Sequence, residues 1–202
     1  MKNYMNIRIE TSSDYAAVER LTFAAFETMN LPGRTHTSEH FLVSLLRSDP
    51  WFIPELDFVA EVSGEIVGSI FYSHSKIVRP EGGETGTITF GPVSVAPKLH
   101  GRGIGSALIR HSLERARQMY LRAVLIMGHP GYYPRFGFTG AANFGITLAD
   151  GAGHDAFMAL ELVPGTLTAA GGRWQCAKAF DICENNTEAF EAYHRRFLSN
   201  FP

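Results

Sequence analysis

The stretch TITFGPVSVAPKLHGRGIG, Thr87–Gly105, decides the fold of this chain. Its apolar residues first occupy even positions, at Ile88 and Phe90, and then odd positions from Val93 onward. Side chains of a β-strand alternate between two faces, so the apolar face changes over between these residues. Gly91-Pro92 lies at the change, and proline cannot donate to a strand ladder. The pattern predicts a buried strand with a β-bulge or a local opening there, which would turn backbone groups toward a ligand.

Three alternating glycines, Gly101, Gly103 and Gly105, follow this strand and open a predicted helix that continues to about Tyr120. Glycine lets the backbone adopt positive φ angles and come close to a ligand. The N–H groups of a first helical turn have no intrahelical partner and carry the positive end of the helix dipole. The turn therefore predicts an anion site, most naturally for a phosphate or pyrophosphate, with Arg102 as an additional positive charge.

Two common phosphate-binding motifs do not fit the turn. The P-loop pattern GxxxxGK followed by Ser or Thr is absent, and a dinucleotide-binding GxGxxG counted from Gly101 would place Ser106 where the third Gly or Ala belongs. The next predicted strand, Ala123–Met127, also ends without the acidic residue that would bind a ribose. We therefore do not expect a nucleoside triphosphate or NAD at this turn.

A second motif, GHPGYYPRFGF at residues 128–138, lies downstream. Together with HGRGIGSALI it resembles the GNAT superfamily of N-acetyltransferases, in particular a bacterial branch of small-molecule acetyltransferases. The pyrophosphate motif of that superfamily begins with Gln or Arg and has Gly and then Gly or Ala at its fourth and sixth positions. In this chain it is HGRGIG, so His100 departs from the family pattern. The resemblance covers about residues 5–163.

The resemblance implies an α/β (α+β) GNAT fold, with a mixed and mostly antiparallel central sheet that splays at the acetyl-CoA site and with helices on both faces. It places an acetyltransferase domain over residues 5–164, followed by a C-terminal extension over residues 165–202 that ends in an amphipathic helix. The implied activity is the transfer of an acetyl group from acetyl-CoA to a primary amine of a small molecule, by direct attack in a ternary complex. Two alternatives remain open: a protein or peptide N-acetyltransferase with the same donor, and a non-catalytic acyl-CoA-binding module.

The resemblance also assigns roles to individual residues. The donor would be bound by Val93, Ser94, Val95, His100, Gly101, Arg102, Gly103, Ile104, Gly105 and Ser106. The backbone of residues 93–95 would pair with the pantetheine amides and offer an N–H to the thioester oxygen. Tyr133 takes the place of the superfamily tyrosine that protonates the departing thiolate, and a purely structural tyrosine is the alternative.

The general base is less well defined. Many superfamily members carry a glutamate on or near the central strand, but residues 85–95 contain no acidic side chain. His129 follows the strand Ala123–Met127 and is the predicted base, because imidazole ordinarily exchanges protons near neutral pH. A structural or loop-positioning role for His129 is the main alternative. Glu27, Glu61 and His74 are other candidate bases, and a chain of water molecules or an acceptor amine that is already partly deprotonated would need no base.

Composition limits the class of protein and its partners. The chain has 202 residues, of which 45% are hydrophobic and 19% charged, enough for a sizeable core in one domain or in one domain with an extension. Its net charge of −2 and a pI of about 6.4 argue against nucleic acid or an anionic membrane as an obligatory partner. Two cysteines and no apolar run near the length of a membrane span indicate a soluble, cytoplasmic protein with reduced thiols.

No metal site is expected. His36 and His40 are four residues apart, but neither an HExxH motif nor a partner carboxylate accompanies them, so a solvated or substrate-facing pair is favoured. A homodimer is possible, since the final helix could pack on its own domain or on a second subunit.

Hydrophobic periodicity and turn residues predict the remaining elements. A helix follows the polar stretch 11–14 and continues to about Met29, and a second begins near Thr37 or Ser38 and ends near Arg47. Ser63-Gly64 is a predicted two-residue hairpin turn. The other predicted strands are 6–10, 57–62, 65–73, 84–95, 144–148 and 157–162, and a final helix is predicted over 188–198.

Overall fold

The computed structural model describes residues 4–27, 37–168 and 170–200. The chain forms two compact units. The first contains Met1–Phe71, Pro92–His111 and Ala177–Pro202, and the second contains Tyr72–Gly91 and Ser112–Cys176. Strands β3 (Glu65–Val78) and β4 (Glu84–Val95) and helix α3 (Ile104–Gln118) each begin in one unit and end in the other.

The first unit is built on an antiparallel sheet in which β1 (Met5–Ile9) pairs with β2 (Phe58–Val62), and β2 pairs with β3. Ser63 and Gly64 join β2 to β3 with φ angles of 55° and 85°. Positive φ at both residues is typical of a type I′ hairpin turn, so the predicted two-residue turn is confirmed.

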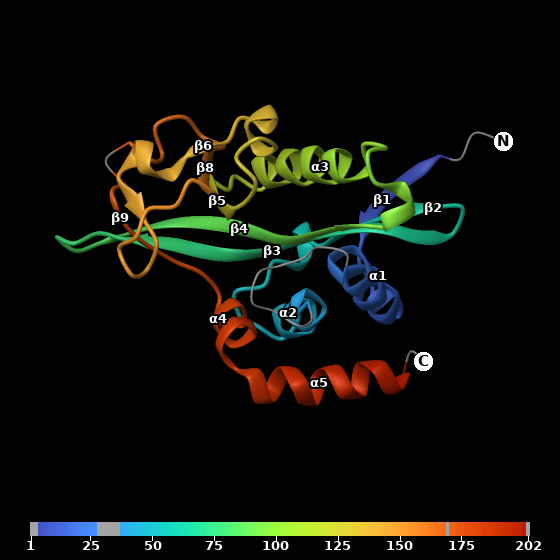
Figure 1. The fold of residues 1–202 in the computed structure, drawn as a ribbon. Helices are drawn as coiled ribbons and strands as arrows, with labels where there is room; N and C mark the ends of the chain where they lie inside the picture. Colours follow the sequence, from blue (N-terminus) through green and yellow to red (C-terminus); the bar gives the residue numbers. More distant parts are fainter. Residues whose placement is uncertain (1–3, 28–36, 169, 201–202) are drawn as a thin grey trace. The chain divides into compact units, whose positions relative to one another are not determined.

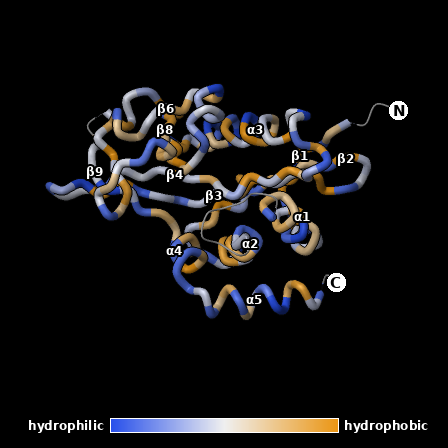
Figure 2. The backbone as a smooth tube through the Cα atoms, in the orientation of Figure 1, coloured by the Kyte–Doolittle hydropathy of each residue, from blue (hydrophilic) through white to orange (hydrophobic). Residues whose placement is uncertain are grey.

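Helices cover both faces of this sheet. One face packs on α1 (Tyr15–Glu27) and α2 (Glu39–Leu46), as Figure 1 shows. Their shared buried core is Val18, Leu42, Val43, Leu46, Val59 and Phe71, and Figure 2 shows α2 as strongly hydrophobic. The other face contacts α3, because a Cβ at Gly68 would meet Ile104 and Leu108 and because the rings of Phe58 and His111 meet edge to face at 4.7 Å.

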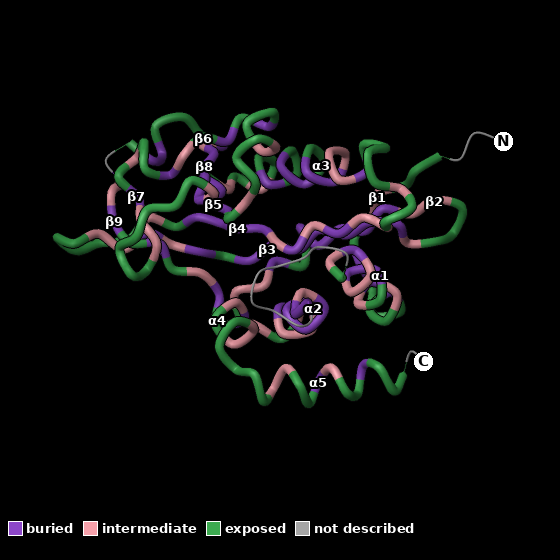
Figure 3. Tube along the Cα trace, in the orientation of Figure 1, coloured by how far each residue is buried: buried purple, intermediate pink, exposed green. Residues whose placement is uncertain are grey.

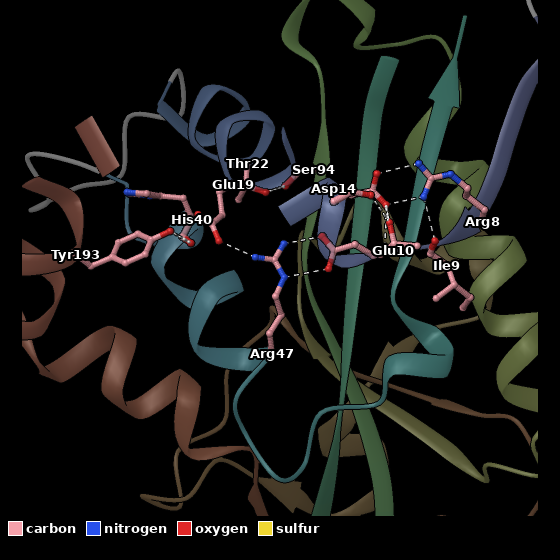
Figure 4. A network of polar contacts seen from close by, with 12 residues as sticks. Arg8, Ile9, Glu10, Asp14, Glu19, Thr22, His40, Arg47, Ser94 and Tyr193 are labelled. Atoms are coloured by element: carbon pink, nitrogen blue, oxygen red, sulfur yellow. Dashed lines mark hydrogen bonds and ion pairs between the residues drawn. The ribbon is translucent and has the colours of Figure 1, made fainter. Parts of the chain in front are cut away.

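A buried ion-pair network joins β1 to the two helices (Figure 4). The guanidinium of Arg47 contacts Glu10 and Glu19, each at 2.6 Å, and its side chain is only 7% exposed. Asp57 lies buried beside this network. Burial, together with the neighbouring Glu10 carboxylate, raises the pKa of Asp57 above its ordinary value.

The C-terminal segment belongs to the first unit and forms two helices, α4 (Lys178–Asn185) and α5 (Thr187–Asn200). Tyr193 and Phe197 of α5 pack on Phe41 of α2, and the Tyr193 hydroxyl donates to the His40 carbonyl at 3.1 Å. Figure 3 shows that most of α5 is exposed apart from this contact. The predicted final helix is confirmed, whereas α4 was not predicted.

His40 corrects one expectation. Its side chain is fully buried and its Nε2 lies 3.1 Å from Nδ1 of His194 on α5, so His40 is not a solvated residue. The other member of the predicted pair, His36, lies outside the described residues.

The second unit contains the end of β3, the beginning of β4 and a further set of strands. β4 pairs in parallel with β5 (Ala123–Met127) at Ile88 and Val124, and β5 pairs antiparallel with β8 (Phe157–Glu161), which also pairs with β6 (Thr139–Gly140). β9 (Gly172–Gln175) is antiparallel to β3 and parallel to β7 (Ile146–Thr147). The sheet is open, mixed and mostly antiparallel, as the predicted fold class requires.

Two strands have other boundaries than predicted, and one strand was not predicted. β3 continues five residues beyond the predicted end, to Val78, because β9 provides it with a further partner strand. The predicted strand 144–148 is reduced to β7, because the 3₁₀ helix Ala141–Phe144 takes up its beginning. β9 itself was not predicted.

Hydrogen bonds support the predicted bulge in β4. Arg79 N–H donates to Gly83 O at the hairpin end, and Ala96 N–H donates to Val67 O farther along. Between these two pairs β3 contributes the eleven residues 68–78 and β4 the twelve residues 84–95. One extra residue on one strand defines a β-bulge.

Candidate functional site

The glycine turn lies between the 3₁₀ helix Pro97–Leu99 and α3. Gly101 and Gly103 have φ angles of 75° and 84°, and a Cβ at either would have no heavy atom within 4 Å. Both positions therefore require glycine for backbone conformation, and the space in front of them is open. Gly105 lies inside α3 and does not use this freedom.

The start of α3 supplies the backbone N–H groups of the predicted anion site. Ala107 N–H donates to Gly103 O at 2.9 Å, closing the first turn of the helix. The amides of Ile104, Gly105 and Ser106 precede this bond and form the helix N-terminus. Arg102 is exposed beside them.

His100 is held back toward β4. Its Nε2 lies 2.8 Å from the carbonyl oxygen of Val95. A carbonyl only accepts hydrogen bonds, so Nε2 carries a proton and donates it there. The imidazole therefore uses one of its two nitrogens to fix the end of β4.

The end of β4 presents backbone groups at the edge away from β3. Ala96 N–H bonds to Val67 of β3 at 2.9 Å. Backbone groups of alternate residues point to the same edge of a strand, so those of Val93 and Val95 point to the opposite edge. The buried Ser94 donates its hydroxyl to Thr22 Oγ1 of α1 at 3.0 Å, which anchors this stretch.

Tyr133 begins the 3₁₀ helix Tyr133–Phe136 in the second unit. Its ring lies among four other aromatic rings, with centroid distances between 5.2 and 6.3 Å: those of Phe90, Tyr132, Phe136 and Phe138. Burial, and to a smaller extent the neighbouring Tyr132, raises the pKa of Tyr133 to about 12. The phenol is therefore protonated at neutral pH, as a proton donor must be.

Two residues near Tyr133 were not predicted to contact it, although Gly128 belongs to the motif 128–138. Gly128 lies so close that a Cβ there would be 2.2 Å from the ring. Tyr72 is fully buried, and its hydroxyl lies 2.9 Å from Ser112 Oγ. Burial raises the pKa of Tyr72, and the proximity of Tyr133 adds to the effect. Neither residue belongs to a local pattern that indicates its neighbour.

His129 stabilises the turn before Tyr133. Its Nδ1 accepts the Gly131 N–H at 3.0 Å, and its carbonyl accepts the N–H groups of Tyr132 and Tyr133. In a neutral imidazole whose Nδ1 accepts, the proton is on Nε2. A base needs a free lone pair, but the lone pair on Nδ1 of His129 already accepts the Gly131 N–H. His129 could take up a proton only by giving up that hydrogen bond.

The other candidate bases lie in different settings. The Glu61 carboxylate accepts from Arg8 Nε at 3.0 Å, while Glu27 and His74 are exposed at the end of α1 and on β3. The structure thus brings the ten predicted donor-binding residues together along one strand end, one turn and one helix start in the first unit. Tyr133 and His129 belong to the second unit.

Neither a metal cluster nor a membrane-spanning helix occurs in the described part of the chain. Residues 4–27, 37–168 and 170–200 contain no group of three or more His, Cys, Asp or Glu side chains arranged to hold a metal ion. Their helices include none with the length and apolar character needed to cross a membrane.

Known proteins match this chain in sequence. The model of the acetyltransferase (GNAT) domain matches residues 55–140. YjhQ of Escherichia coli K12, an uncharacterized N-acetyltransferase, is 33% identical over 107 residues, which span 53% of this chain and 59% of YjhQ. The N-acetyltransferase YhbS of the same strain, also uncharacterized, is 29% identical over 140 residues, spanning 69% of this chain and 76% of YhbS.

Solved structures match as well. YhbS from Escherichia coli, described in complex with CoA, aligns with a TM-score of 0.77 over 90% of this chain and 94% of that one, at 24% identity. A GNAT family acetyltransferase from Brucella melitensis, described in complex with acetyl-CoA, aligns with a TM-score of 0.64 at 32% identity, over 80% of this chain and 90% of that one. With its open sheet, its glycine turn and these relatives, the chain belongs to the GNAT family of acetyltransferases.

Proposed function

We propose that this protein transfers an acetyl group from acetyl-CoA to a primary amine of a small molecule, by direct attack within a ternary complex. The observation that carries the proposal is the turn at Gly101 and Gly103, where positive φ angles and open space lie at the start of a 15-residue helix. Such a turn suits a pyrophosphate. The Brucella melitensis relative, described in complex with acetyl-CoA, supports the choice of donor.

The donor would be bound mainly by backbone groups. The amides of residues 101 and 103–106 would bind the pyrophosphate, since Arg102 N–H already donates to Leu99 O, and the Arg102 side chain would add charge. His100 stands where the family has Gln or Arg, and its bond to Val95 favours a structural contribution over a phosphate contact from Nε2. Val93 and Val95 would pair with the pantetheine through the strand edge that faces away from β3, with Ser94 holding them in place.

The reaction needs one nucleophile and two proton transfers. The amine nitrogen attacks the thioester carbonyl carbon, and a backbone N–H of residues 93–95 stabilises the charge that develops on the oxygen. A C–N bond forms and the C–S bond breaks. The departing thiolate takes the phenolic proton of Tyr133, which recovers it from solvent, and the products are an amide and CoA.

The proton lost by the amine goes to a base, and His129 is the predicted residue. Its Nδ1 hydrogen bond to Gly131 favours the alternative of a water chain that leads the proton to solvent. The proposal also includes a cytoplasmic location and no obligatory nucleic-acid or membrane partner, in keeping with the net charge of −2. A homodimer stays a prediction.

The test begins with a thermal-shift titration of acetyl-CoA, CoA and NAD in parallel. A ligand at 100 times its dissociation constant stabilises the folded state by about 2.7 kcal/mol, or roughly 5–10 °C for a chain of this length. We expect both CoA species to raise the melting temperature and NAD to leave it unchanged. A response to NAD alone would contradict the assignment of the turn.

A screen of small amines and Lys-containing peptides for CoA release then separates the functions. Turnover with small amines supports the proposal, and turnover with peptides alone would favour a protein acetyltransferase. Binding of acetyl-CoA without CoA release from any amine would indicate a non-catalytic acyl-CoA-binding module.

A further inference from the structure

Gly128 follows β5 and is held firmly in place. Its N–H donates to Ala156 O at 2.8 Å, which fixes the backbone beside the segment that leads into β8. Its φ angle lies outside the left-handed region, so the backbone at this position does not itself require glycine. The reason for a glycine must lie in its surroundings.

Those surroundings are the ring of Tyr133. A Cβ at Gly128 would lie 2.2 Å from Cε2, 2.5 Å from Cδ2 and 3.1 Å from Cζ of that ring. The first two distances are far inside van der Waals contact, where carbon atoms repel strongly. Any side chain at this position therefore requires the ring or the backbone to move.

The ring is not free to move away without cost. Phe90 and Phe138 have their ring centroids 5.9 and 5.8 Å from that of Tyr133. The backbone of the segment is tied by Tyr133 N–H to His129 O and by Gly137 N–H to Pro134 O. Aromatic rings in such a cluster pack at near-optimal distances, so a shift of one ring disturbs the others.

We propose that Gly128 is a positioning residue for Tyr133. Because residue 128 has no side chain, the phenol ring can occupy the space beside it, and this packing sets the position of the Tyr133 hydroxyl. The inference rests on the proposed function in so far as Tyr133 delivers the proton to the thiolate. A displaced ring would deliver the proton from the wrong position, which lowers turnover. Donor affinity should change little, because the three atoms nearest to a Cβ at Gly128 all belong to Tyr133 and none to a predicted donor-binding residue.

A stability cycle tests the packing part without any substrate. The variants are Gly128→Ala, Tyr133→Ala and the double variant. We expect Gly128→Ala alone to lower the melting temperature by about 3–8 °C, as overpacking does in a chain of this size. In the Tyr133→Ala protein the same change should not lower the melting temperature further, because the ring is absent.

Gly140→Ala is the matched control. Gly140 has a φ angle of −59°, and a Cβ added there would have no heavy atom within 4 Å, so alanine is accommodated. If Gly128→Ala lowers the melting temperature equally in the wild-type and the Tyr133→Ala protein, the inference is overturned. If Gly128→Ala does not fold at all, recovery of folding in the double variant supports it, and failure of the double variant overturns it.

A kinetic cycle tests the catalytic part, with an amine that gives CoA release. Gly128→Ala should lower kcat by roughly 10–100-fold, within the range of general-acid contributions, and leave the acetyl-CoA dissociation constant within about twofold. Tyr133→Phe retains the ring but not the acid, so adding Gly128→Ala to it should lower kcat no further. If the double variant instead loses kcat by the product of the two single-variant losses, the positioning role is overturned. Wild-type kcat in Tyr133→Phe would instead contradict the acid assignment in the proposed function, while the stability cycle still decides the packing part.

Discussion

Glycine serves opposite purposes in the two regions on which the proposed chemistry depends. At Gly101 and Gly103 the backbone has positive φ, and nothing lies within 4 Å of a Cβ position. At Gly128 the backbone is ordinary, and a Cβ would enter the ring of Tyr133. The first region keeps space for a ligand, and the second gives space to another part of the same chain.

The comparison shows which kind of glycine a sequence reveals. A glycine needed for a turn stands in a local pattern of turn and helix-start residues, so its role can be predicted. A glycine needed for packing depends on which side chain arrives from elsewhere in the fold. Gly128 is only five residues from Tyr133, yet no pattern of spacing indicates that contact.

The largest effect should come from charge in the open turn. Gly103→Asp places a carboxylate where the pyrophosphate would bind, so repulsion and bulk should weaken acetyl-CoA binding at least about 100-fold in a calorimetric titration. Gly64→Asp is the matched control, because Gly64 has a similar φ of 85° and open space around it but lies in the β2–β3 hairpin. Unchanged affinity in Gly103→Asp would remove the phosphate assignment.

Removal of the phenol should have the next largest effect. Tyr133→Phe keeps the ring on Gly128 but removes the proton donor, so kcat should fall roughly 100-fold with acetyl-CoA affinity nearly unchanged. Burial raises the pKa of Tyr133 to about 12. At any pH up to about 11 the phenol therefore keeps its proton, and its ionisation should not reduce the wild-type kcat. Equal kcat values in the two proteins would leave Tyr133 a packing residue.

Substitutions of His129 distinguish a base from a turn residue. Asn can accept the N–H two residues ahead, as Nδ1 of His129 does with Gly131, but it cannot act as a base. If the histidine serves the turn, His129→Asn should retain kcat within about twofold, while His129→Ala should lower it several-fold by loosening the segment before Tyr133. A loss of about 100-fold in both variants would instead support the predicted base.

The smallest expected effect is a gain in stability at a third kind of position. Tyr120 lies in the turn just after α3, with a φ of 58°, and is 88% exposed. Leu121 N–H donates to Ala116 O at 3.1 Å in the pattern of a helix C-cap. The positive φ favours glycine at this position for backbone conformation alone. Tyr120→Gly should therefore stabilise the fold by about 1 kcal/mol, or roughly 2–4 °C in a melting experiment. A lower melting temperature would mean that the exposed ring makes a stabilising contact.

Local patterns predicted several elements well. The strand Ala123–Met127 agrees with β5 at both ends, because its apolar run is bounded by Arg122 and by Gly128. The hairpin at Ser63-Gly64 and the final helix were predicted for similar reasons, since turn residues and helical periodicity lie within the segment itself.

The elements that were missed depend on distant partners. The helix α4 has no side-chain cap of its own, and its Ala179 N–H instead donates to the carboxylate of Asp49 at 3.0 Å, 130 residues earlier in the chain. The strand β9 has four residues and pairs with β3 from the first half of the sequence. Neither a remote cap nor a remote strand partner leaves a signal in the segment that it stabilises.

The sequence by itself determined the glycine turn and the bulged strand before it, because both depend on backbone preferences of consecutive residues. It also carried the resemblance to acetyltransferases, in two motifs that can be found without the structure. The tertiary structure decided the contact between Gly128 and Tyr133, the burial that raises the pKa of that phenol, and the cap of α4. The physical reason is that packing and desolvation depend on which groups meet in space, and that choice is made only when the whole chain folds.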